Sequence, residues 1–250
     1  MTISAVVLTK NSEDTIKACI SSLSWCTEII VVDDYSSDAT VRIAKKSGAI
    51  LFFRKLENDF AAQRNFALAK ARSDWVFFVD ADEQVTQELT REILQKIETG
   101  TAVGFKLKRS DFFLGRRLAF GETGKIRLTR LGKKGFGLWE RPIHEEWQLK
   151  GVIGNLALPL IHHPHSNLAG FLSKINWYTT LNAHYFNTQG VTSSWFEILL
   201  FPPAKFLKNY FFLGGFLDGM EGFIHALCMS FHSFLTRAKL YLLQNKFRSS

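Results

Sequence analysis

Residues 75–83 of this 250-residue chain read Trp75-Val76-Phe77-Phe78-Val79-Asp80-Ala81-Asp82-Glu83. Five consecutive apolar residues are typical of a strand covered on both faces, and such strands usually belong to parallel sheets inside α/β domains. The run stops at clustered carboxylates, which therefore lie at the carboxyl end of the strand. Ligands bind at that edge of open α/β sheets, so the stretch predicts both a fold class and the place of a site.

Asp80 and Asp82 are candidate metal ligands. Side chains two residues apart on an extended chain point the same way, so both can converge on one cation. Hard oxygen ligands suit Mg²⁺ or Mn²⁺, which prefer one or two carboxylates together with a substrate's phosphates. An isolated Asp-x-Asp is often no more than a solvated acidic turn, but its position after a buried strand favours a divalent metal site.

Strand and helix patterns alternate through the first part of the chain. Short apolar runs at 3–9, 28–32 and 50–53 predict strands, and the segments between them carry helix caps or helical spacing. This alternation indicates right-handed crossovers and a mostly parallel sheet. Each strand then delivers its following loop to one edge, which would carry residues 9–11, 33–34 and 80–82.

A nucleotide suits such an edge. A carboxylate accepts hydrogen bonds from a base N–H or from ribose hydroxyls, and a metal offsets the charge of a diphosphate. The loops contain no Gly-x-Gly-x-x-Gly and no Gly-x-x-x-x-Gly-Lys-Ser/Thr, which disfavours the dinucleotide fold and the P-loop. The sequence supplies acids in their place, and these need a cation to hold phosphate.

Four segments, in this order and spacing, resemble the signatures of family 2 nucleotide-sugar glycosyltransferases: Val6-Val7-Leu8-Thr9-Lys10-Asn11, Val31-Val32-Asp33-Asp34-Tyr35-Ser36-Ser37-Asp38-Ala39-Thr40, Ala62-Gln63-Arg64-Asn65 and Phe78-Val79-Asp80-Ala81-Asp82-Glu83. Two later segments resemble the branch that adds a sugar to the inner core of lipopolysaccharide, the heptose β-1,4-glucosyltransferase type: His144-Glu145 and Ile161-His162-His163. One departure is visible, because Asp34-Tyr35 stands where the family usually has Asp-Gly.

The resemblance implies an A-type glycosyltransferase fold, an α/β class with a Rossmann-like, mostly parallel sheet between helices, here followed by a C-terminal helical appendage. It also implies an inverting transferase that uses a UDP-sugar and a divalent metal. By the family pattern Asp33 or Asp34 would bind uracil and ribose, Arg64 would lie near the base or orient Asp80, and Asp82 would bind the metal. The nucleotide-binding residues expected on this basis are Thr9, Asn11, Asp33, Asp34, Arg64 and Asp80.

Residues 139–147 form a second chemical cluster. An inverting transfer needs a general base that takes the proton from the acceptor hydroxyl, and a carboxylate within hydrogen-bond reach can do so. By resemblance Glu145 is the expected base and His144 an acceptor-binding residue. Glu146 and Asp111 remain alternatives for the base, because the sequence gives no distances.

A strand predicted over 153–161 leads into His162-His163-Pro164-His165. Histidine is a common partner of carboxylates around a divalent metal. His162 fits the branch pattern best as an additional metal ligand, with His163 as the second choice. The spacing is not the i, i+4 pattern of a helical zinc pair, and a surface loop of neutral histidines is the other interpretation.

Basic residues gather between Arg109 and Arg130 among glycines and aromatics. Such a stretch would suit a phosphorylated acceptor, and Arg116 and Arg117 are the acceptor-binding candidates; a solvated loop is the alternative. The expected organisation is a nucleotide-sugar half over 1–100, an acceptor half of the same domain over 101–166 and a helical appendage over 167–250.

The appendage combines basic and aromatic residues. Helical spacing predicts a long helix to about Phe186, Pro202-Pro203 is expected to break the chain, and a further helix is predicted over 216–243. Basic, aromatic and aliphatic residues together fit a helix lying in a membrane interface, although the helices can also pack on the catalytic domain. No uncharged apolar segment reaches the roughly 20 residues that a spanning helix needs, so the chain is expected to lie on a membrane without crossing it.

Composition narrows the partners and the compartment. The net charge of +8 suits an anionic partner, and 23 phenylalanines, many of them late in the chain, favour a lipid surface over nucleic acid. Three cysteines without C-x-x-C spacing fit a reducing compartment, and the N-terminus fits a first strand better than a signal peptide. The expected location is cytoplasmic, peripheral on the inner face of the cytoplasmic membrane of a bacterial cell envelope.

Together with these patterns, the resemblance implies an inverting, metal-dependent glycosyltransferase that moves a hexose, glucose first, from a UDP-sugar to a lipid-anchored saccharide such as lipopolysaccharide core heptose. A transferase that loads a hexose onto polyprenyl phosphate is the rival within the same class; it needs no base, since a phosphate is already ionised. A nucleotidyltransferase and a non-catalytic basic membrane- or RNA-binding protein are the rivals from other classes.

Overall fold

A computed structural model of the chain describes residues 1–165 and 167–246, without the side chains of Lys125, His165 and Lys246. Two compact units are present, one of Met1–Arg109 with Ile126–His162 and one of Ser110–Lys125 with His163–Ser250. The structure thus groups 110–125 with the C-terminal helices. The domain bounds expected at 166 and 250 lie outside the described residues.

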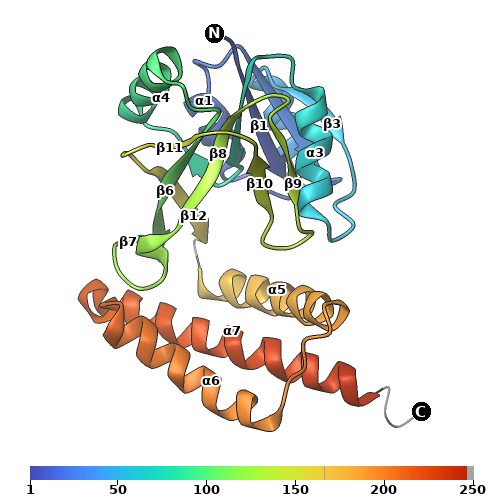
Figure 1. Cartoon of the computed structure of the whole chain (residues 1–250), viewed down its shortest axis with the longest axis vertical. Coiled ribbons are helices and arrows are strands. Elements are labelled where there is room, and N and C mark those ends of the chain that lie inside the picture. The colour runs from blue at the N-terminus through green and yellow to red at the C-terminus, as the bar shows by residue number, and fades with distance from the viewer. Residues whose placement is uncertain (166, 247–250) are drawn as a thin grey trace. The chain divides into compact units, whose positions relative to one another are not determined.

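A parallel sheet forms the heart of the first unit (Figure 1). Its strands lie in the order β3 (Ile50–Phe53), β2 (Glu28–Asp33), β1 (Ile3–Thr9), β4 (Trp75–Asp80), and every pairing among them is parallel. The connecting helices are α1 (Ile16–Ser22), α2 (Thr40–Lys46) and α3 (Phe60–Lys70). The predicted α/β class with a mostly parallel sheet is confirmed.

Antiparallel strands extend the sheet beyond β4. β8 (Arg127–Lys133) pairs with β4, β6 (Gly104–Phe113) pairs with β8, and β11 (Ile153–Asn155) runs parallel to β6. The two-residue β5 (Glu83–Gln84) pairs with β12 (Leu160–His165) and sets His162 opposite Glu83. The helix α4 (Gln87–Thr99) begins where Thr86 Oγ1 accepts a hydrogen bond from Leu89 N.

The single strand predicted over 153–161 is wrong, because β11 and β12 are separate strands. The carboxylate of Glu92 accepts hydrogen bonds from the backbone N–H groups of Ala157 and Leu158, at 2.6 and 3.0 Å. These donors are therefore not available to a strand ladder. A side chain from α4 thus divides an apolar run that reads as continuous in the sequence.

Both faces of β4 are buried, as its unbroken apolar run predicts. Trp75, Phe77 and Val79 belong to a core cluster that includes α1 and α4, and Val76 and Phe78 belong to a second cluster on the other face. The acids after β4 therefore follow a rigid strand.

A hairpin of β9 (Gly137–Glu140) and β10 (Glu146–Leu149) packs on the second cluster. The rings of Trp139 and Trp147 stack with centroids 5.4 Å apart, and both meet the edge of Phe78 at about the same distance, 5.0 and 5.1 Å. Three aromatic rings thus fix the hairpin to β4. The loop of residues 141–145 lies at its end.

The second unit contains the short β7 (Arg116–Leu118), which pairs with the end of β6, and the 3₁₀ helix η1 (Thr123–Lys125). Its long helices are α5 (Leu168–Thr188), α6 (Trp195–Leu207) and α7 (Gly219–Lys246), and α7 packs against the other two (Figure 1). A π-helical turn η2 (Lys208–Phe212) and a 3₁₀ turn η3 (Gly215–Asp218) connect α6 to α7. None of the described helices is both long enough and apolar enough to cross a membrane.

The break predicted at Pro202-Pro203 is wrong, since both prolines lie inside α6. A proline removes one backbone donor from a helix, but its fixed φ is compatible with helical backbone. The carbonyl of Pro202 accepts a hydrogen bond of 2.7 Å from Ser230 Oγ of α7. Packing and hydrogen bonding to α7 hold the helix through a sequence that locally disfavours it.

Candidate active site

Three strands of the first unit end together at one edge of the sheet. Thr9 of β1 lies opposite Asp33 of β2, and Leu8 of β1 lies opposite Asp80 of β4. The loops after β1, β2 and β4 therefore leave the sheet at the same edge, as the alternating pattern predicts. These loops carry most of the expected nucleotide-binding residues.

The loop after β2 is ordered by its own carboxylates. Asp33 is fully buried and accepts hydrogen bonds from Ser36 N at 2.7 Å and Ser36 Oγ at 2.6 Å. Asp34 accepts from Lys10 Nζ at 2.7 Å and from Leu56 N at 3.1 Å. Asp33 thus shapes the turn, whereas Asp34 lies nearer the surface beside a lysine.

Tyr35 adopts a left-handed backbone conformation with φ +52°. Glycine adopts this conformation without strain, which explains why the family has Asp-Gly at this turn. The tyrosine keeps the turn despite its Cβ atom, and its ring lies 5.9 Å from that of Phe53. Residue 35 therefore takes a left-handed conformation although it is a tyrosine and not a glycine.

Asn11 and Thr9 lie on the loop beside this turn. Asn11 Oδ1 accepts a hydrogen bond of 2.8 Å from Ser37 N, so the amide ties the β1 loop to the β2 loop. Thr9 Oγ1 is buried, and no other described residue hydrogen-bonds to it. A buried hydroxyl without a partner costs free energy, which a polar ligand can recover.

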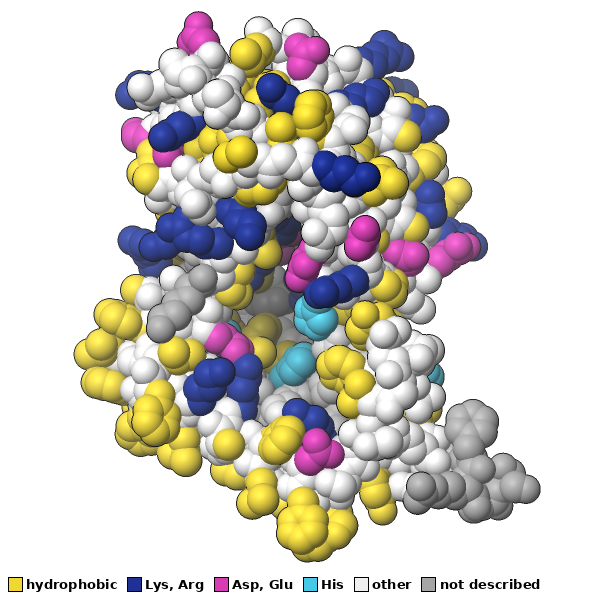
Figure 2. All heavy atoms as spheres, viewed as in Figure 1, with side chains coloured by type: hydrophobic (Ala, Val, Ile, Leu, Met, Phe, Trp, Pro, Cys, Tyr) yellow, Lys and Arg dark blue, Asp and Glu magenta, His cyan; other side chains and the backbone are white. Residues whose placement is uncertain are grey.

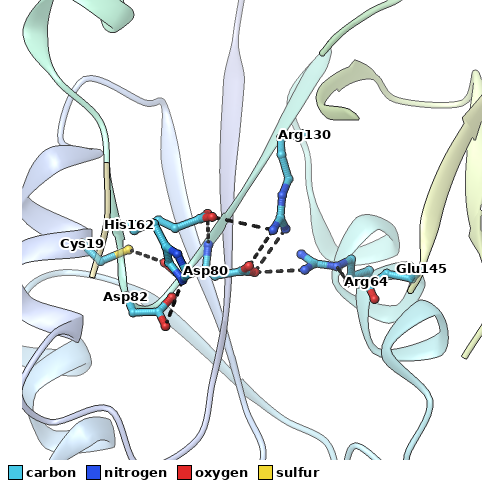
Figure 3. A network of polar contacts seen from close by, with 8 residues as sticks. Cys19, Arg64, Asp80, Asp82, Arg130, Glu145 and His162 are labelled. Atoms are coloured by element: carbon cyan, nitrogen blue, oxygen red, sulfur yellow. Dashed lines mark hydrogen bonds and ion pairs between the residues drawn. The ribbon is translucent and has the colours of Figure 1, made fainter. Parts of the chain in front are cut away.

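Asp80 is held by two arginines (Figure 3). Its Oδ1 accepts from Arg64 Nη2 at 2.9 Å and Arg130 Nη1 at 3.2 Å, and its Oδ2 accepts from Arg130 Nη2 at 2.6 Å. Burial by itself raises the pKa of a carboxyl, but the charges of Arg130 and Arg64 outweigh this effect and hold the pKa of Asp80 well below its usual range. Asp80 is ionised at neutral pH.

Glu83 also contacts Asp80 and Arg130. It is fully buried, its Oε2 accepts from Asp80 N at 2.8 Å, and its Oε1 lies 3.7 Å from Arg130 Nη2. Burial raises the pKa of Glu83 above its usual value, against the opposing charge of Arg130. The glutamate therefore supports the backbone of Asp80 and the guanidinium of Arg130 at once.

Arg64 links Asp80 to Glu145 (Figure 3). Its Nε donates to Glu145 Oε1 at 2.8 Å while its Nη2 donates to Asp80, and its guanidinium lies over the Trp139 ring at 4.7 Å. Its third nitrogen, Nη1, is buried, and none of the described residues accepts from it. One guanidinium thus joins the expected donor-site acid to the expected base.

The neighbours of Arg64 in its motif position the elements around it. Gln63 Nε2 donates to the carbonyl of Arg54 at 2.9 Å. Asn65 bonds the backbone of Trp139 twice at 2.9 Å, donating to its carbonyl and accepting from its N–H. Asn65 therefore fixes the hairpin whose loop carries Glu145.

Asp82 and His162 lie together, with Asp82 Oδ2 3.4 Å from His162 Nε2. No group of three or more His, Cys, Asp or Glu side chains is arranged around a common metal position within the described residues. One carboxylate and one imidazole, completed by phosphate oxygens, nevertheless match the ligands that Mg²⁺ or Mn²⁺ accepts. Asp82 and His162 therefore fit a metal role, whereas both oxygens of Asp80 are occupied by guanidinium groups.

The structure separates Glu145 from its nearest alternative. Glu146 is exposed and pairs with Arg141 at 2.9 Å, while His144, also exposed, lies in the hairpin loop with φ +55°. Asp111 is buried in the second unit. Only Glu145 of these three acids bonds Arg64.

The remaining expected residues belong to the second unit. Arg116 and Arg117 lie on β7, where Arg116 Nη1 is 3.3 Å from Glu221 Oε2 of α7. The ring of His163 packs on Phe112, with centroids 4.7 Å apart. The side chains of Lys125 and His165 lie outside the described part of the structure.

Arg130 is the site residue whose role the sequence patterns missed. It stands in the basic stretch that suggests an acceptor surface, yet it is only 5% exposed and bonds Asp80. The local signal is weak, because Arg130 follows the half-buried Thr129 and only Leu131, after it, is a buried apolar neighbour. A buried arginine requires an acidic partner. The partner itself is 50 residues away and could not be read from spacing.

The fold defines the class of protein. Glucosyl-3-phosphoglycerate synthase from Mycobacterium tuberculosis, solved in complex with Mn²⁺, uridine diphosphate and phosphoglyceric acid, matches 77% of this chain and 80% of its own, with a TM-score of 0.52 and 17% sequence identity. This likeness shows the A-type glycosyltransferase fold.

The chain belongs to Glycosyl transferase family 2, whose sequence model matches residues 4–177. It is 30% identical to the lipopolysaccharide core biosynthesis glycosyltransferase LpsC of Rhizobium meliloti (strain 1021), over 96% of this chain and 92% of the relative. It is 29% identical to an uncharacterized glycosyltransferase of Rickettsia typhi (strain ATCC VR-144 / Wilmington), over 99% of this chain and 89% of the relative. The protein is a glycosyltransferase.

Proposed function

We propose that this glycosyltransferase moves a hexose, glucose first, from a UDP-sugar to a hydroxyl of a lipid-linked saccharide such as lipopolysaccharide core heptose, with inversion at the anomeric carbon. The proposal depends on one observation: the guanidinium of Arg64 hydrogen-bonds both Asp80, at the expected nucleotide edge, and Glu145, a carboxylate suited to act as base. The name of the relative LpsC supports a lipopolysaccharide core acceptor.

The donor would lie on the edge formed by the β1, β2 and β4 loops. Asp34 offers acceptors for base and ribose groups, and so does Asp80 Oδ2, which accepts only one hydrogen bond within the described residues. The buried Thr9 Oγ1 and Arg64 Nη1 offer polar atoms that lack a partner within the described residues. Uridine diphosphate in the structural neighbour supports this choice of donor. Because Asp80 is already held by two arginines, its carboxylate needs little reorganisation when a ligand binds.

Asp82 and His162 would hold a divalent ion, Mg²⁺ or Mn²⁺, together with donor phosphates. Such an ion neutralises negative charge on the leaving diphosphate when it is bound. The Mn²⁺ bound by the structural neighbour supports this assignment. Titration calorimetry of Mn²⁺ into wild type and His162→Ala, with UDP present, tests it without reference to activity.

Glu145 would take the proton from the acceptor hydroxyl. Arg64 occupies only Oε1, and Oε2 makes no hydrogen bond within the described residues, so one oxygen stays available to the acceptor. Transfer from UDP-sugar then forms the glycosidic bond, breaks the bond from sugar to diphosphate, and leaves the hydroxyl proton on Glu145.

The free thiols of Cys19, Cys26 and Cys228 are compatible with the expected cytoplasmic location.

A UDP-release assay tests the proposal. Purified protein is given a panel of UDP-sugars, with and without Mn²⁺, and extracted lipopolysaccharide core as acceptor. UDP release that depends on the acceptor, and a product that carries the sugar, are expected. Release of pyrophosphate would indicate a nucleotidyltransferase, and a Glu145→Gln variant at full rate on polyprenyl phosphate would indicate the rival that needs no base.

A further inference from the structure

The helix α6 is apolar on all sides but has no buried residue. Its only charged side chains are Glu197, in the capping box with Ser194, and Lys205, paired with Glu122. A helix that is hydrophobic all round is normally buried, but α7, which packs against α6, leaves most of its large apolar side chains exposed. Its exposed large apolar residues are Trp195, Phe196, Leu199, Leu200, Phe201 and Leu207.

The turn between α6 and α7 extends this exposure. Phe212 is 83% exposed, and Phe211, Phe216, Leu217 and Met220 are each about half exposed or more. The exposed apolar residues from Trp195 to Met220 are called here the apolar face. Figure 2 shows yellow hydrophobic side chains gathered over the helical unit. Large exposed apolar side chains gathered in this number on one unit indicate an interaction site.

Hydrogen bonds fix the backbone of the turn between α6 and α7, which carries the exposed phenylalanines. Asp218 accepts from Ala119 N at 3.1 Å and Phe120 N at 2.9 Å, and Gly121 N donates to the carbonyl of Leu213 at 3.0 Å. A Cβ at Gly215 would meet Asn209 O at 2.7 Å, which shows how closely the backbone packs there. Contacts within the second unit therefore hold this backbone in place, and the apolar side chains that it carries are exposed.

The charges around the apolar face favour an anionic partner. The acids of α6, the turn and α7 are all engaged: Glu197 with its cap and Arg237, Asp218 with β7 loop amides, and Glu221 with Arg116. Lys208 is exposed at the start of the π-helical turn that carries Phe211 and Phe212, and no carboxylate of the described residues lies within ion-pair distance of it. A second copy of this face would bring like charges together, whereas anionic lipid headgroups would complement them.

We propose that the apolar face binds the surface of an anionic lipid bilayer, with Phe211, Phe212 and Leu217 entering the acyl boundary and Lys208 at the headgroup phosphates. Aromatic and aliphatic side chains beside basic residues, on a short helix lying flat, are the features of such interfacial binding. The inference extends the proposed function, because it places the enzyme where a lipid-linked acceptor lies. It rests on side chains outside the donor site.

Vesicle flotation tests the inference. The full chain, without donor or acceptor, is mixed with phosphatidylglycerol–phosphatidylethanolamine vesicles or with phosphatidylcholine vesicles. Wild type is expected to float with the anionic vesicles and to bind neutral vesicles more weakly. Phe211→Ser plus Phe212→Ser is expected to lower the partition coefficient by about tenfold or more, because two phenylalanine rings are then no longer transferred from water into the acyl boundary.

Matched variants separate the face from general hydrophobicity. Phe136→Ser plus Leu138→Ser removes two exposed apolar residues of the first unit and is expected to leave flotation unchanged. Lys208→Glu is expected to weaken binding to anionic vesicles and to spare binding to neutral ones. Circular dichroism melts confirm that each variant is folded.

Absence of flotation by folded wild type, or equal flotation of the double phenylalanine variant, overturns the inference. A dimer in light scattering that Phe211→Ser plus Phe212→Ser converts to monomer also overturns it, because the face is then covered by a second copy. Flotation without UDP release contradicts only the proposed function. UDP release from a soluble core oligosaccharide without flotation contradicts only the membrane inference.

Discussion

Among single residues, Arg64 is the one that contacts both Asp80 and the expected base Glu145. It is buried, lies over an aromatic ring, and bonds one carboxylate from the nucleotide edge and another from the β9–β10 loop. Two charge-assisted hydrogen bonds from a planar guanidinium fix both carboxylates in direction as well as in distance. The catalytic proposal therefore depends on Glu145 more than on any neighbouring acid.

Replacement of Glu145 by Gln keeps the size of the side chain and one acceptor for Arg64 but removes the base. We expect kcat to fall by about a hundredfold or more, the usual contribution of a general base, with little change in the affinity for UDP. Steady-state UDP release measures the first and calorimetry the second. Glu146→Gln is the matched control, and if it proved as damaging as Glu145→Gln, the assignment of the base would have to move.

The raised pKa of Glu83 makes a prediction about stability and pH. A carboxyl whose pKa is higher in the folded state contributes stability that is present below its unfolded value, about 4.3, and is lost as pH rises through the folded pKa. The free energy of unfolding of wild type should therefore decline relative to Glu83→Gln as pH rises. Urea unfolding at pH 4.5 to 7 measures this, and a constant difference would argue against a strained buried carboxylate.

At the level of elements, the β9–β10 hairpin brings Glu145 to the site. Asn65 bonds the backbone of Trp139 on both sides, and Phe60 N donates to the carbonyl of Pro142 at 2.9 Å in the loop itself. The start and middle of α3 thus hold both the strand and the loop that precedes the base.

Asn65→Ala is expected to loosen the hairpin while leaving the donor edge intact. Loss of two hydrogen bonds of about 1 kcal/mol each predicts a free energy of unfolding lower by about 2 kcal/mol. We expect kcat to fall while the affinity for UDP is retained. Urea unfolding, UDP release and calorimetry provide the three readings, with Asn155→Ala on β11 as control; a parallel loss of UDP affinity would show that Asn65 acts on the donor edge instead.

Local patterns predicted some elements well and others not at all. The continuous apolar run of β4 is a local signal, and the strand forms where it is expected. Pro202 and Pro203 mislead because Ser230 and α7 act on them from elsewhere in the chain. The split between β11 and β12 likewise depends on Glu92, which no pattern near residue 157 reveals.

On the scale of the whole molecule, the family order of motifs predicted the fold, and the alternating pattern predicted that the loops after β1, β2 and β4 leave the sheet at one edge. Pairings across long separations could not be predicted, and Arg130 with Asp80 is the main example. The sequence also did not predict the association of residues 110–125 with the C-terminal helices, because it depends on Asp218, which accepts hydrogen bonds from the amides of Ala119 and Phe120. The roles of Arg116, Arg117 and His144 toward an acceptor stay predictions.

The net charge of +8 predicts how transfer responds to salt. Attraction between a basic protein and a phosphorylated acceptor is screened over about 8–10 Å at physiological ionic strength. We expect kcat/KM for phosphorylated core to fall more steeply between low and high salt than kcat/KM for the same core after dephosphorylation. Equal salt dependence for both acceptors would mean that the basic residues do not recognise acceptor phosphate.

The proposed function depends most on the binding of uridine diphosphate by Asp34, after β2, and by Asp80, at the end of β4. Calorimetric titration of UDP, with Mn²⁺ present, into wild type and into folded Asp34→Asn and Asp80→Asn variants measures it directly. Wild type is predicted to bind one UDP, and each substitution to weaken binding by about tenfold or more, the loss expected for a charged hydrogen-bond acceptor. Undiminished UDP binding by both variants would contradict the account.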